Sequence, residues 1–216
     1  MNNIGFLFDL DGVLIDSESE YTRIWEEIER HFPTGVKDFA SVIKGMTLDK
    51  ILNDYFPEPA NRPEVERLLY KMEKEMTYRF CPGVEDFLHE MREAEIPAAV
   101  VTSSNGDKMA HLYQDIPYFR DLFPIIIDSS KVSRSKPDPE GYLLAAQTIG
   151  VRPQNCIVFE DSVQGVMAGN RAGAFVVGVC GTKKAEELSP HSHLLIYSFE
   201  EITPDIIKKK KEKRNE

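Results

Sequence analysis

Two aspartates directly follow the most apolar segment near the start of the chain, in the run Asp9-Leu10-Asp11-Gly12. Residues 4–8 before them are almost all apolar, as expected of a strand buried on both faces of a parallel sheet. If the backbone stays extended, the two carboxylates lie on the same side. Buried carboxylates cost free energy unless a cation or hydrogen-bond donors compensate them. The pattern therefore suits a cation site, although a polar turn explains these four residues equally well.

Further polar residues follow later apolar segments of the chain. They are Thr102 and Ser103 after residues 97–101, Lys136 beyond residues 125–127, and Glu160 with Asp161 after residues 156–159. The carboxyl ends of parallel strands meet at one edge of a sheet, so we expect these side chains and the first two aspartates to converge there. Carboxylate oxygens are the ligands that Mg²⁺ takes together with water and phosphate. The lysine and the hydroxyls suit a phosphate group.

Each of these later residues also has an ordinary structural explanation. Thr102 would cap a helix, and Lys136 would be a solvated lysine before a helix that starts with proline. The two acids at 160 and 161 would stabilise a helix N-terminus through its dipole. Their occurrence in order after successive strands favours one shared site.

The elements that carry these residues alternate between strands and helices. Strands are predicted at residues 4–8, 97–101, 125–127, 156–159, 174–179 and 194–197, with helices at 84–95, 137–149 and 162–172 between them. Such alternation implies right-handed crossovers and a parallel sheet covered by helices on both faces. The predicted fold class is α/β, with a doubly wound parallel sheet.

Residues 16–80 differ from the rest of the chain because no strand is predicted in them. Apolar residues recur at i, i+3 and i+4 in segments 20–31, 39–43, 48–56 and 65–76, which is typical of amphipathic helices. We expect a catalytic core of residues 1–15 and 81–216 and an inserted helical domain of residues 16–80.

The helix predicted at residues 162–172 contains glycines at a spacing of four, Gly165, Gly169 and Gly173. An interior glycine costs about 1 kcal/mol relative to alanine. We therefore expect a flat glycine ridge that lets this helix lie close to the sheet or to the loop after the first strand. Gly173 is expected to end the helix.

The charge of the chain argues against nucleic acid as a partner, because the formal net charge is −10. The exception is the basic segment 208–214. Such a segment could contact nucleic acid or an anionic surface, but we interpret it as the solvated, fraying end of a helix. Three cysteines without metal-binding spacing indicate a reducing compartment and inert thiols. Asp9 and Asp11 interrupt the N-terminal apolar run, so no signal peptide is expected. No apolar run approaches the length of a membrane span, so none is expected either. The prediction is a cytoplasmic protein.

Four segments of this chain resemble the four motifs of the haloacid dehalogenase (HAD) superfamily. They are Phe8-Asp9-Leu10-Asp11-Gly12-Val13, Val101-Thr102-Ser103-Ser104, Ser135-Lys136-Pro137-Asp138-Pro139 and Phe159-Glu160-Asp161-Ser162-Val163-Gln164-Gly165. More narrowly, the chain is similar to the β-phosphoglucomutase-like phosphatases, which carry a small helical cap after the first strand. The resemblance implies a Rossmann-like core with an inserted all-α cap.

The resemblance also implies a role for each motif residue. Asp9 would be the nucleophile, and Asp11 the general acid and base. Mg²⁺ would be bound by Asp9, the backbone carbonyl of Asp11, Asp161 and Glu160. The transferring phosphoryl group would be held by Thr102, Ser103 and Lys136.

The implied activity is Mg²⁺-dependent hydrolysis of a small phosphate monoester, a sugar phosphate as the family expectation, by a monomeric enzyme. A β-phosphoglucomutase-type mutase is the alternative. Leu48 and Tyr21 stand where mutases carry an arginine and a histidine, which favours the phosphatase. Further candidate substrate contacts are Glu18, Lys44 and Asn105.

Other classes of protein fit the sequence less well. A dehalogenase of the superfamily needs neither Asp11 nor the metal-binding acids. A phospho-acceptor receiver domain would place its aspartate after a middle strand and would lack the helical insert. A sugar-phosphate sensor without catalytic activity would not need the intact pair of aspartates.

Overall fold

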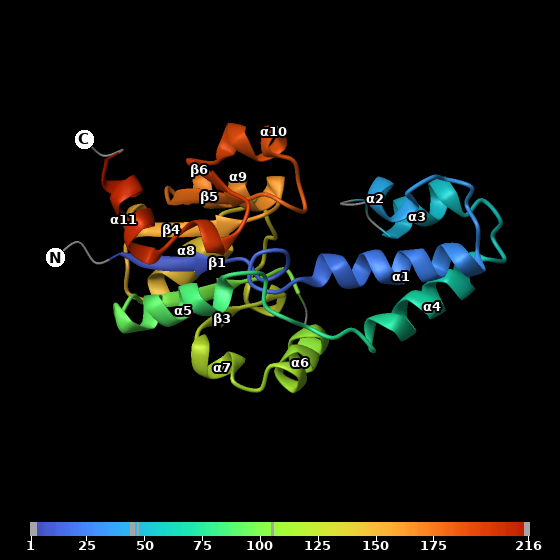
Figure 1. Cartoon of the computed structure of the whole chain (residues 1–216), viewed down its shortest axis with the longest axis horizontal. Coiled ribbons are helices and arrows are strands. Elements are labelled where there is room, and N and C mark those ends of the chain that lie inside the picture. Colours follow the sequence, from blue (N-terminus) through green and yellow to red (C-terminus); the bar gives the residue numbers. More distant parts are fainter. Residues whose placement is uncertain (1–3, 44–45, 47, 105, 214–216) are drawn as a thin grey trace. The chain divides into compact units, whose positions relative to one another are not determined.

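The computed structural model describes residues 4–43, 46, 48–104 and 106–213 and divides into two compact units. The larger unit, here called the core unit, comprises Met1–Asp16 and Tyr78–Glu216, and the smaller, the helical unit, is Ser17–Thr77. The core unit contains a sheet with its helices, whereas the described residues of the helical unit contain helices only (Figure 1).

The sheet of the core unit has six parallel strands in the order β3-β2-β1-β4-β5-β6. The strands are β1 (Gly5–Phe8), β2 (Ala98–Val101), β3 (Ile126–Ile127), β4 (Cys156–Glu160), β5 (Phe175–Val179) and β6 (Leu194–Ile196). The strand order reverses between β1 and β4, and ligands bind beyond the carboxyl ends of strands at such a point. The predicted doubly wound α/β fold is confirmed.

The helices of the core unit follow the predicted alternation. They are α5 (Val84–Glu93), α6 (Gly106–Asp115), α7 (Phe119–Leu122), α8 (Glu140–Thr148), α9 (Val163–Arg171), α10 (Ala185–Leu188) and α11 (Pro204–Glu212). The four-residue helices α7 and α10 are too short to show a helical repeat in the sequence and were not predicted.

Both faces of β1 are buried, which explains its unbroken apolar run. Leu7 belongs to a core shared with residues of α8 and α9. Phe6 and Phe8 contact Phe87 of α5 and Phe159 of β4, and the Phe8 and Phe159 rings stack with centroids 4.8 Å apart. Burial of each such side chain contributes roughly 1.5–3 kcal/mol. This packing fixes the strand ends that carry the acidic residues.

Helix α9 lies close to the sheet through its glycines, as predicted. A Cβ atom at Gly169 would lie 3.0 Å from Val158 and 3.1 Å from Val176, both on neighbouring strands. Gly173 follows the end of α9 with a positive φ of 82°, which favours glycine and ends the helix.

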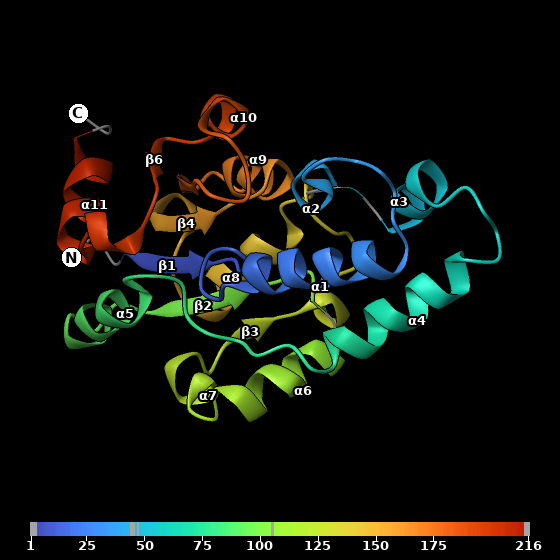
Figure 2. The same cartoon turned by 45° about the vertical axis from the view of Figure 1, so that its right-hand side comes forward.

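The helical unit consists of α1 (Ser17–His31), α2 (Phe39–Val42), α3 (Leu48–Tyr55) and α4 (Arg62–Glu73). Helices α1 and α4 pack side by side (Figure 2). Trp25 of α1 packs on Phe39, whose ring also contacts Tyr55 and Phe56. These are the apolar residues whose spacing predicted the helices.

The basic C-terminal segment agrees in part with its prediction as a solvated helix end, because Lys209 and Lys210 are exposed. Residues 208–212 belong to α11, which is capped by the Thr203 side chain and packs on α5. Ile207 is fully buried and Lys211 is only 7% exposed. For Lys211 the prediction was wrong, because the run of lysines in the sequence gives no sign that one side of this short helix is buried.

The thiols agree with the predicted inert state. Cys81 is half-buried, Cys156 and Cys180 are buried, and each is a free thiol. Burial raises the pKa of Cys81 and of Cys156 to about 12. Separately, none of the helices in the described part of the chain is long and apolar enough to cross a membrane.

Candidate active site

Three buried carboxylates lie together at the carboxyl ends of β1 and β4. Asp9 directly follows β1, and its backbone N–H donates to the carbonyl of Phe159 at 3.0 Å, which extends the pairing with β4. Glu160 is the last residue of β4 and Asp161 follows it. Each of the three acids offers an oxygen that lies within 4.8 Å of the others. They are 7%, 0% and 6% exposed, respectively.

The electrostatics of this acidic cluster call for a cation. Burial, and then the charges of Glu160 and Asp11, raise the pKa of Asp9 to about 7 even though Lys136 lowers it. Burial, with the charge of Asp9, raises the pKa of Asp161 well above its ordinary value. Three carboxylates and one ammonium leave an excess of negative charge in a buried place, which costs free energy. A hard divalent cation such as Mg²⁺ fits this set of oxygen ligands.

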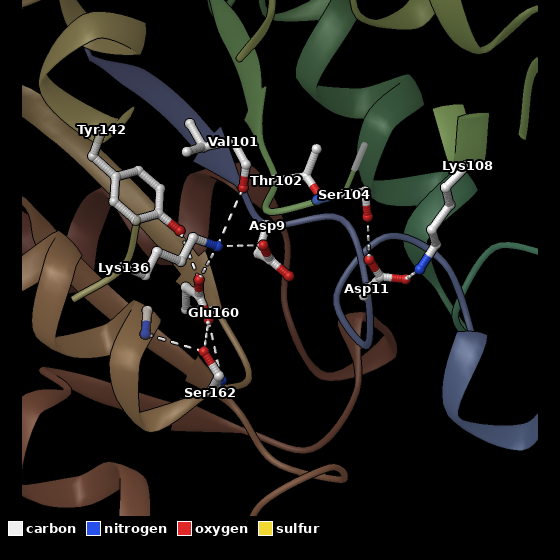
Figure 3. Close-up of polar contacts among 11 residues, drawn as sticks. Asp9, Asp11, Val101, Thr102, Ser104, Lys108, Lys136, Tyr142, Glu160 and Ser162 are labelled. Atoms are coloured by element: carbon white, nitrogen blue, oxygen red, sulfur yellow. Dashed lines mark hydrogen bonds and ion pairs between the residues drawn. The ribbon is translucent and has the colours of Figure 1, made fainter. Parts of the chain in front are cut away.

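Lys136 joins two of these acids. Its ammonium forms ion pairs with Asp9 and with Glu160 and donates to the Val101 carbonyl at 3.2 Å (Figure 3). Burial lowers the pKa of Lys136, but the two carboxylates raise it more, so the group stays charged. The lysine therefore supplies a fixed positive charge beside the Asp9 carboxylate.

Glu160 is held by several donors besides Lys136. The Tyr142 hydroxyl of α8 donates to Glu160 Oε1 at 2.9 Å. The backbone N–H and the hydroxyl of Ser162 donate to Oε2 at 3.1 and 3.0 Å. Figure 3 shows these side chains around Glu160. Both carboxylate oxygens are thus fixed in place by hydrogen bonds.

Two glycines make room for the acidic cluster. Gly12 has a φ of 72°, and a Cβ atom there would overlap the Asp161 carboxylate. A Cβ atom at Gly165, in the first turn of α9, would overlap the Glu160 carboxylate. Gly165 therefore leaves room for the Glu160 carboxylate, whereas Gly169 lets α9 pack closely on the sheet.

Asp11 points to a different set of partners. Ser104 donates to Asp11 Oδ2 at 2.9 Å, and the Lys108 ammonium of α6 forms an ion pair with Oδ1. Figure 3 shows Asp11 turned toward Ser104 and Lys108, with Asp9 on its other side. Asp11 remains close enough to raise the pKa of Asp9 by its charge.

The remaining predicted residues of the core unit line a neighbouring hollow. Thr102, Ser103 and Lys136 all border a cavity of about 250 Å³. Thr102 is buried and accepts a hydrogen bond from the Ser104 N–H at 3.0 Å, whereas Ser103 is exposed. Ser103 follows β2 on the same segment as Thr102.

The three predicted substrate contacts, Glu18 and Lys44 of the insert and Asn105 of the core unit, are less fully described. Glu18 lines a cavity of about 270 Å³ within the helical unit. Lys44 and Asn105 lie outside the described residues. The cavity is bordered by Glu18, Tyr21, Trp25, Leu48, Tyr70 and Glu73 among others, and the Tyr21 hydroxyl donates to Glu73 at 3.1 Å. None of the described residues that line it is a lysine, arginine or histidine.

The sequence did not indicate several polar residues of the site. Ser104 and Ser162 lie inside two of the four motifs, beside the residues to which the resemblance gives a role. Lys108 and Tyr142 lie in the first turns of α6 and α8, where a lysine or tyrosine carries no signal of its own. Only the packing of α6 and α8 beside the strand ends reveals them.

Comparison with known proteins agrees with this geometry. The sequence model of the haloacid dehalogenase-like hydrolases matches residues 6–179. The chain is 33% identical over 198 residues to validoxylamine A 7'-phosphate phosphatase of Streptomyces hygroscopicus subsp. limoneus, which covers 88% of this chain and 91% of the relative. It is 31% identical over 205 residues to hexitol phosphatase A of Escherichia coli (strain K12), and this alignment covers 92% of this chain and 93% of the relative.

Solved structures of similar fold include a HAD family hydrolase from Deinococcus radiodurans R1 with bound phosphate and sodium. It superposes with a TM-score of 0.82 at 26% identity and covers 96% of each chain. The similarity therefore extends over the core unit and the helical unit alike.

Proposed function

Because this chain belongs to the haloacid dehalogenase-like hydrolases, we propose that it hydrolyses a small phosphate monoester, a sugar phosphate, in a Mg²⁺-dependent reaction through an aspartyl-phosphate intermediate. Two relatives above 30% identity are named phosphatases, and the chain is a phosphoric monoester hydrolase of this family. The observation that carries the finer proposal is the buried cluster of Asp9, Glu160 and Asp161 with Lys136 beside the nucleophile.

Asp9 is the nucleophile in this proposal. One of its carboxylate oxygens attacks phosphorus, and the bond from phosphorus to the leaving ester oxygen breaks. Asp11 donates a proton to that leaving oxygen. Water then attacks the aspartyl phosphate while Asp11 takes its proton, and inorganic phosphate and free Asp9 result. The ion pair with Lys136 limits the charge repulsion that opposes the first attack.

Mg²⁺ would be held by Asp9, Asp161, Glu160 and the backbone carbonyl of Asp11. When bound, the ion offsets the repulsion between carboxylate and phosphate and polarises the phosphoryl oxygens. This assignment of a Mg²⁺ site rests on three buried carboxylates that lie close together beside a single ammonium. Thr102, the Ser103 N–H and Lys136 would bind the phosphoryl oxygens as their charge redistributes.

In this proposal a monophosphate substrate is favoured over the bisphosphate of a mutase, because Leu48 and Tyr21 stand where mutases carry an arginine and a histidine. The cavity of the helical unit is lined by the carboxylates of Glu18 and Glu73 together with aromatic rings. Leu48 also supplies no positive charge to that cavity. A monomeric state and a cytoplasmic location remain predictions from the sequence.

The direct test is phosphate release from a panel of phosphate esters with and without Mg²⁺. We expect hydrolysis of sugar or polyol monophosphates that EDTA abolishes, and much slower conversion of bisphosphates. Asp9→Asn keeps the size of the side chain but removes the nucleophile, so turnover should fall by at least about 10³-fold. Near-normal hydrolysis by Asp9→Asn would contradict the assigned nucleophile, and binding of the esters without any turnover would indicate a sensor.

A further inference from the structure

The general acid and base of the proposed reaction is tied to a lysine that the motifs do not include. Lys108, in the first turn of α6, forms an ion pair with Asp11 Oδ1. The side chains of Lys108 and Asp11 are 20% and 32% exposed. The pair therefore lies at the edge of the site, where solvent weakens it without abolishing it.

The contacts of Asp11 occupy both of its carboxylate oxygens. Lys108 pairs with Oδ1, and the Ser104 hydroxyl donates to Oδ2 at 2.9 Å. In this position both carboxylate oxygens are directed at these two donors and not toward Asp9, where a leaving group would lie in the proposed reaction. Figure 3 shows that both partners hold Asp11 on the side away from Asp9.

The helix that carries Lys108 is firmly fixed within the core unit. Met109 and Leu112 on its inner face are buried. At its end, Asp115 accepts a hydrogen bond from the Tyr78 N–H at 2.8 Å, and the Lys108 ammonium lies 5.8 Å from the Tyr78 ring centroid. A charge held on such an anchored helix can determine where Asp11 rests.

We propose that Lys108 is a positioning residue that holds Asp11 in a resting position, so that this ion pair opens each time Asp11 protonates a leaving group. The inference rests on the proposed function, in which Asp11 is the acid. An interaction made in the resting state and lost in the transition state slows the chemical step. Removal of the Lys108 charge therefore speeds the step in which Asp11 donates its proton.

The test compares two leaving groups in single-turnover experiments. Alcohol release from an alkyl phosphate needs a proton, whereas p-nitrophenolate is a good leaving group without one. For Lys108→Met, the rate of alcohol release divided by that of p-nitrophenolate release should rise about twofold to fivefold, the factor expected for one exposed ion pair. Lys108→Arg keeps the pair and should restore the wild-type ratio.

The matched control is Lys210→Met, which removes the same charge from an exposed position of α11. Its ratio should equal that of the wild type. An unchanged or lower ratio in Lys108→Met, or an equal rise in Lys210→Met, would overturn the inference while phosphatase activity stands. If Lys108→Met unfolds, Lys108→Gln takes its place. A wild-type protein that releases neither leaving group would overturn the proposed function itself, and the inference with it.

Discussion

At the scale of single residues, the site depends on side chains that never reach the substrate. Tyr142 is 1% exposed and Glu160 is 0% exposed, and the hydroxyl of one donates to a carboxylate oxygen of the other at 2.9 Å. Burial, and then the charge of Glu160, raise the pKa of Tyr142 well above its ordinary value, so the hydroxyl remains a donor. Tyr142 therefore fixes the orientation of an acid of the proposed metal site.

We predict that Tyr142→Phe weakens Mg²⁺ binding. Loss of the hydroxyl leaves Glu160 with one donor fewer, and partners that orient metal ligands are typically worth about 10-fold to 100-fold in metal affinity. The Mg²⁺ concentration that gives half-maximal activity should rise by about that factor, with stability lower by roughly 1.5–3 kcal/mol. Tyr197→Phe is the control, because Tyr197 is 67% exposed. An unchanged Mg²⁺ requirement in Tyr142→Phe would show that the hydroxyl does not orient Glu160.

At the scale of elements, α9 both packs on the sheet and accommodates the acidic cluster, and its glycines separate the two tasks. In Gly165→Ala the new methyl group would overlap the Glu160 carboxylate. That carboxylate must then move away from Lys136 and Ser162. In Gly169→Ala the nearest neighbours of the methyl group would be Val158 and Val176, which are stiff, β-branched side chains.

The two alanine variants should therefore fail in different ways. Gly165→Ala should lose at least about 10-fold in kcat, because a displaced acid of the metal site disturbs the phosphoryl-transfer geometry. Gly169→Ala should keep kcat within about twofold and lose roughly 1 kcal/mol of stability, since overpacking costs about 1–3 kcal/mol and better helix propensity returns about 1 kcal/mol. Kinetics and thermal unfolding of both variants check this. Equal losses of activity in the two variants would contradict the assignment of different roles to Gly165 and Gly169.

The elements also show what the sequence can and cannot predict. Strands β1, β2 and β4 were predicted because both of their faces are buried, which leaves apolar runs that end in polar residues. Lys108 and Tyr142 were missed because their importance depends on which helix lies beside which strand end. The sequence predicts a solvated Lys211, which is in fact buried, because a run of four lysines shows no apolar side of α11. The role and burial of such residues depend on contacts between elements that are distant in the sequence. Local sequence patterns do not predict those contacts.

At the scale of the whole molecule, the proposed active site opposes folding when the metal is absent. Asp9, Glu160 and Asp161 are nearly fully buried, and only Lys136 balances them among the described ion pairs. Burial and repulsion raise the pKa of Asp9 and of Asp161, so ionising these groups in the folded protein costs stability. The folded chain thus stores unfavourable electrostatic energy that a cation would relieve.

We predict that Mg²⁺ raises the melting temperature of the wild type, because an ion that binds only the folded state stabilises it by about 2.7 kcal/mol at 100 times its Kd. In EDTA, Asp9→Asn should melt at a higher temperature than the wild type, since it removes one of the repelling carboxylates. The same variant should gain less from Mg²⁺, because it lacks one ligand. Calorimetry in EDTA and in Mg²⁺ measures both effects, with Asp205→Asn as an exposed control on α11. If Asp9→Asn melts lower than the wild type in EDTA, its ion pair with Lys136 stabilises the fold more than the acidic cluster destabilises it.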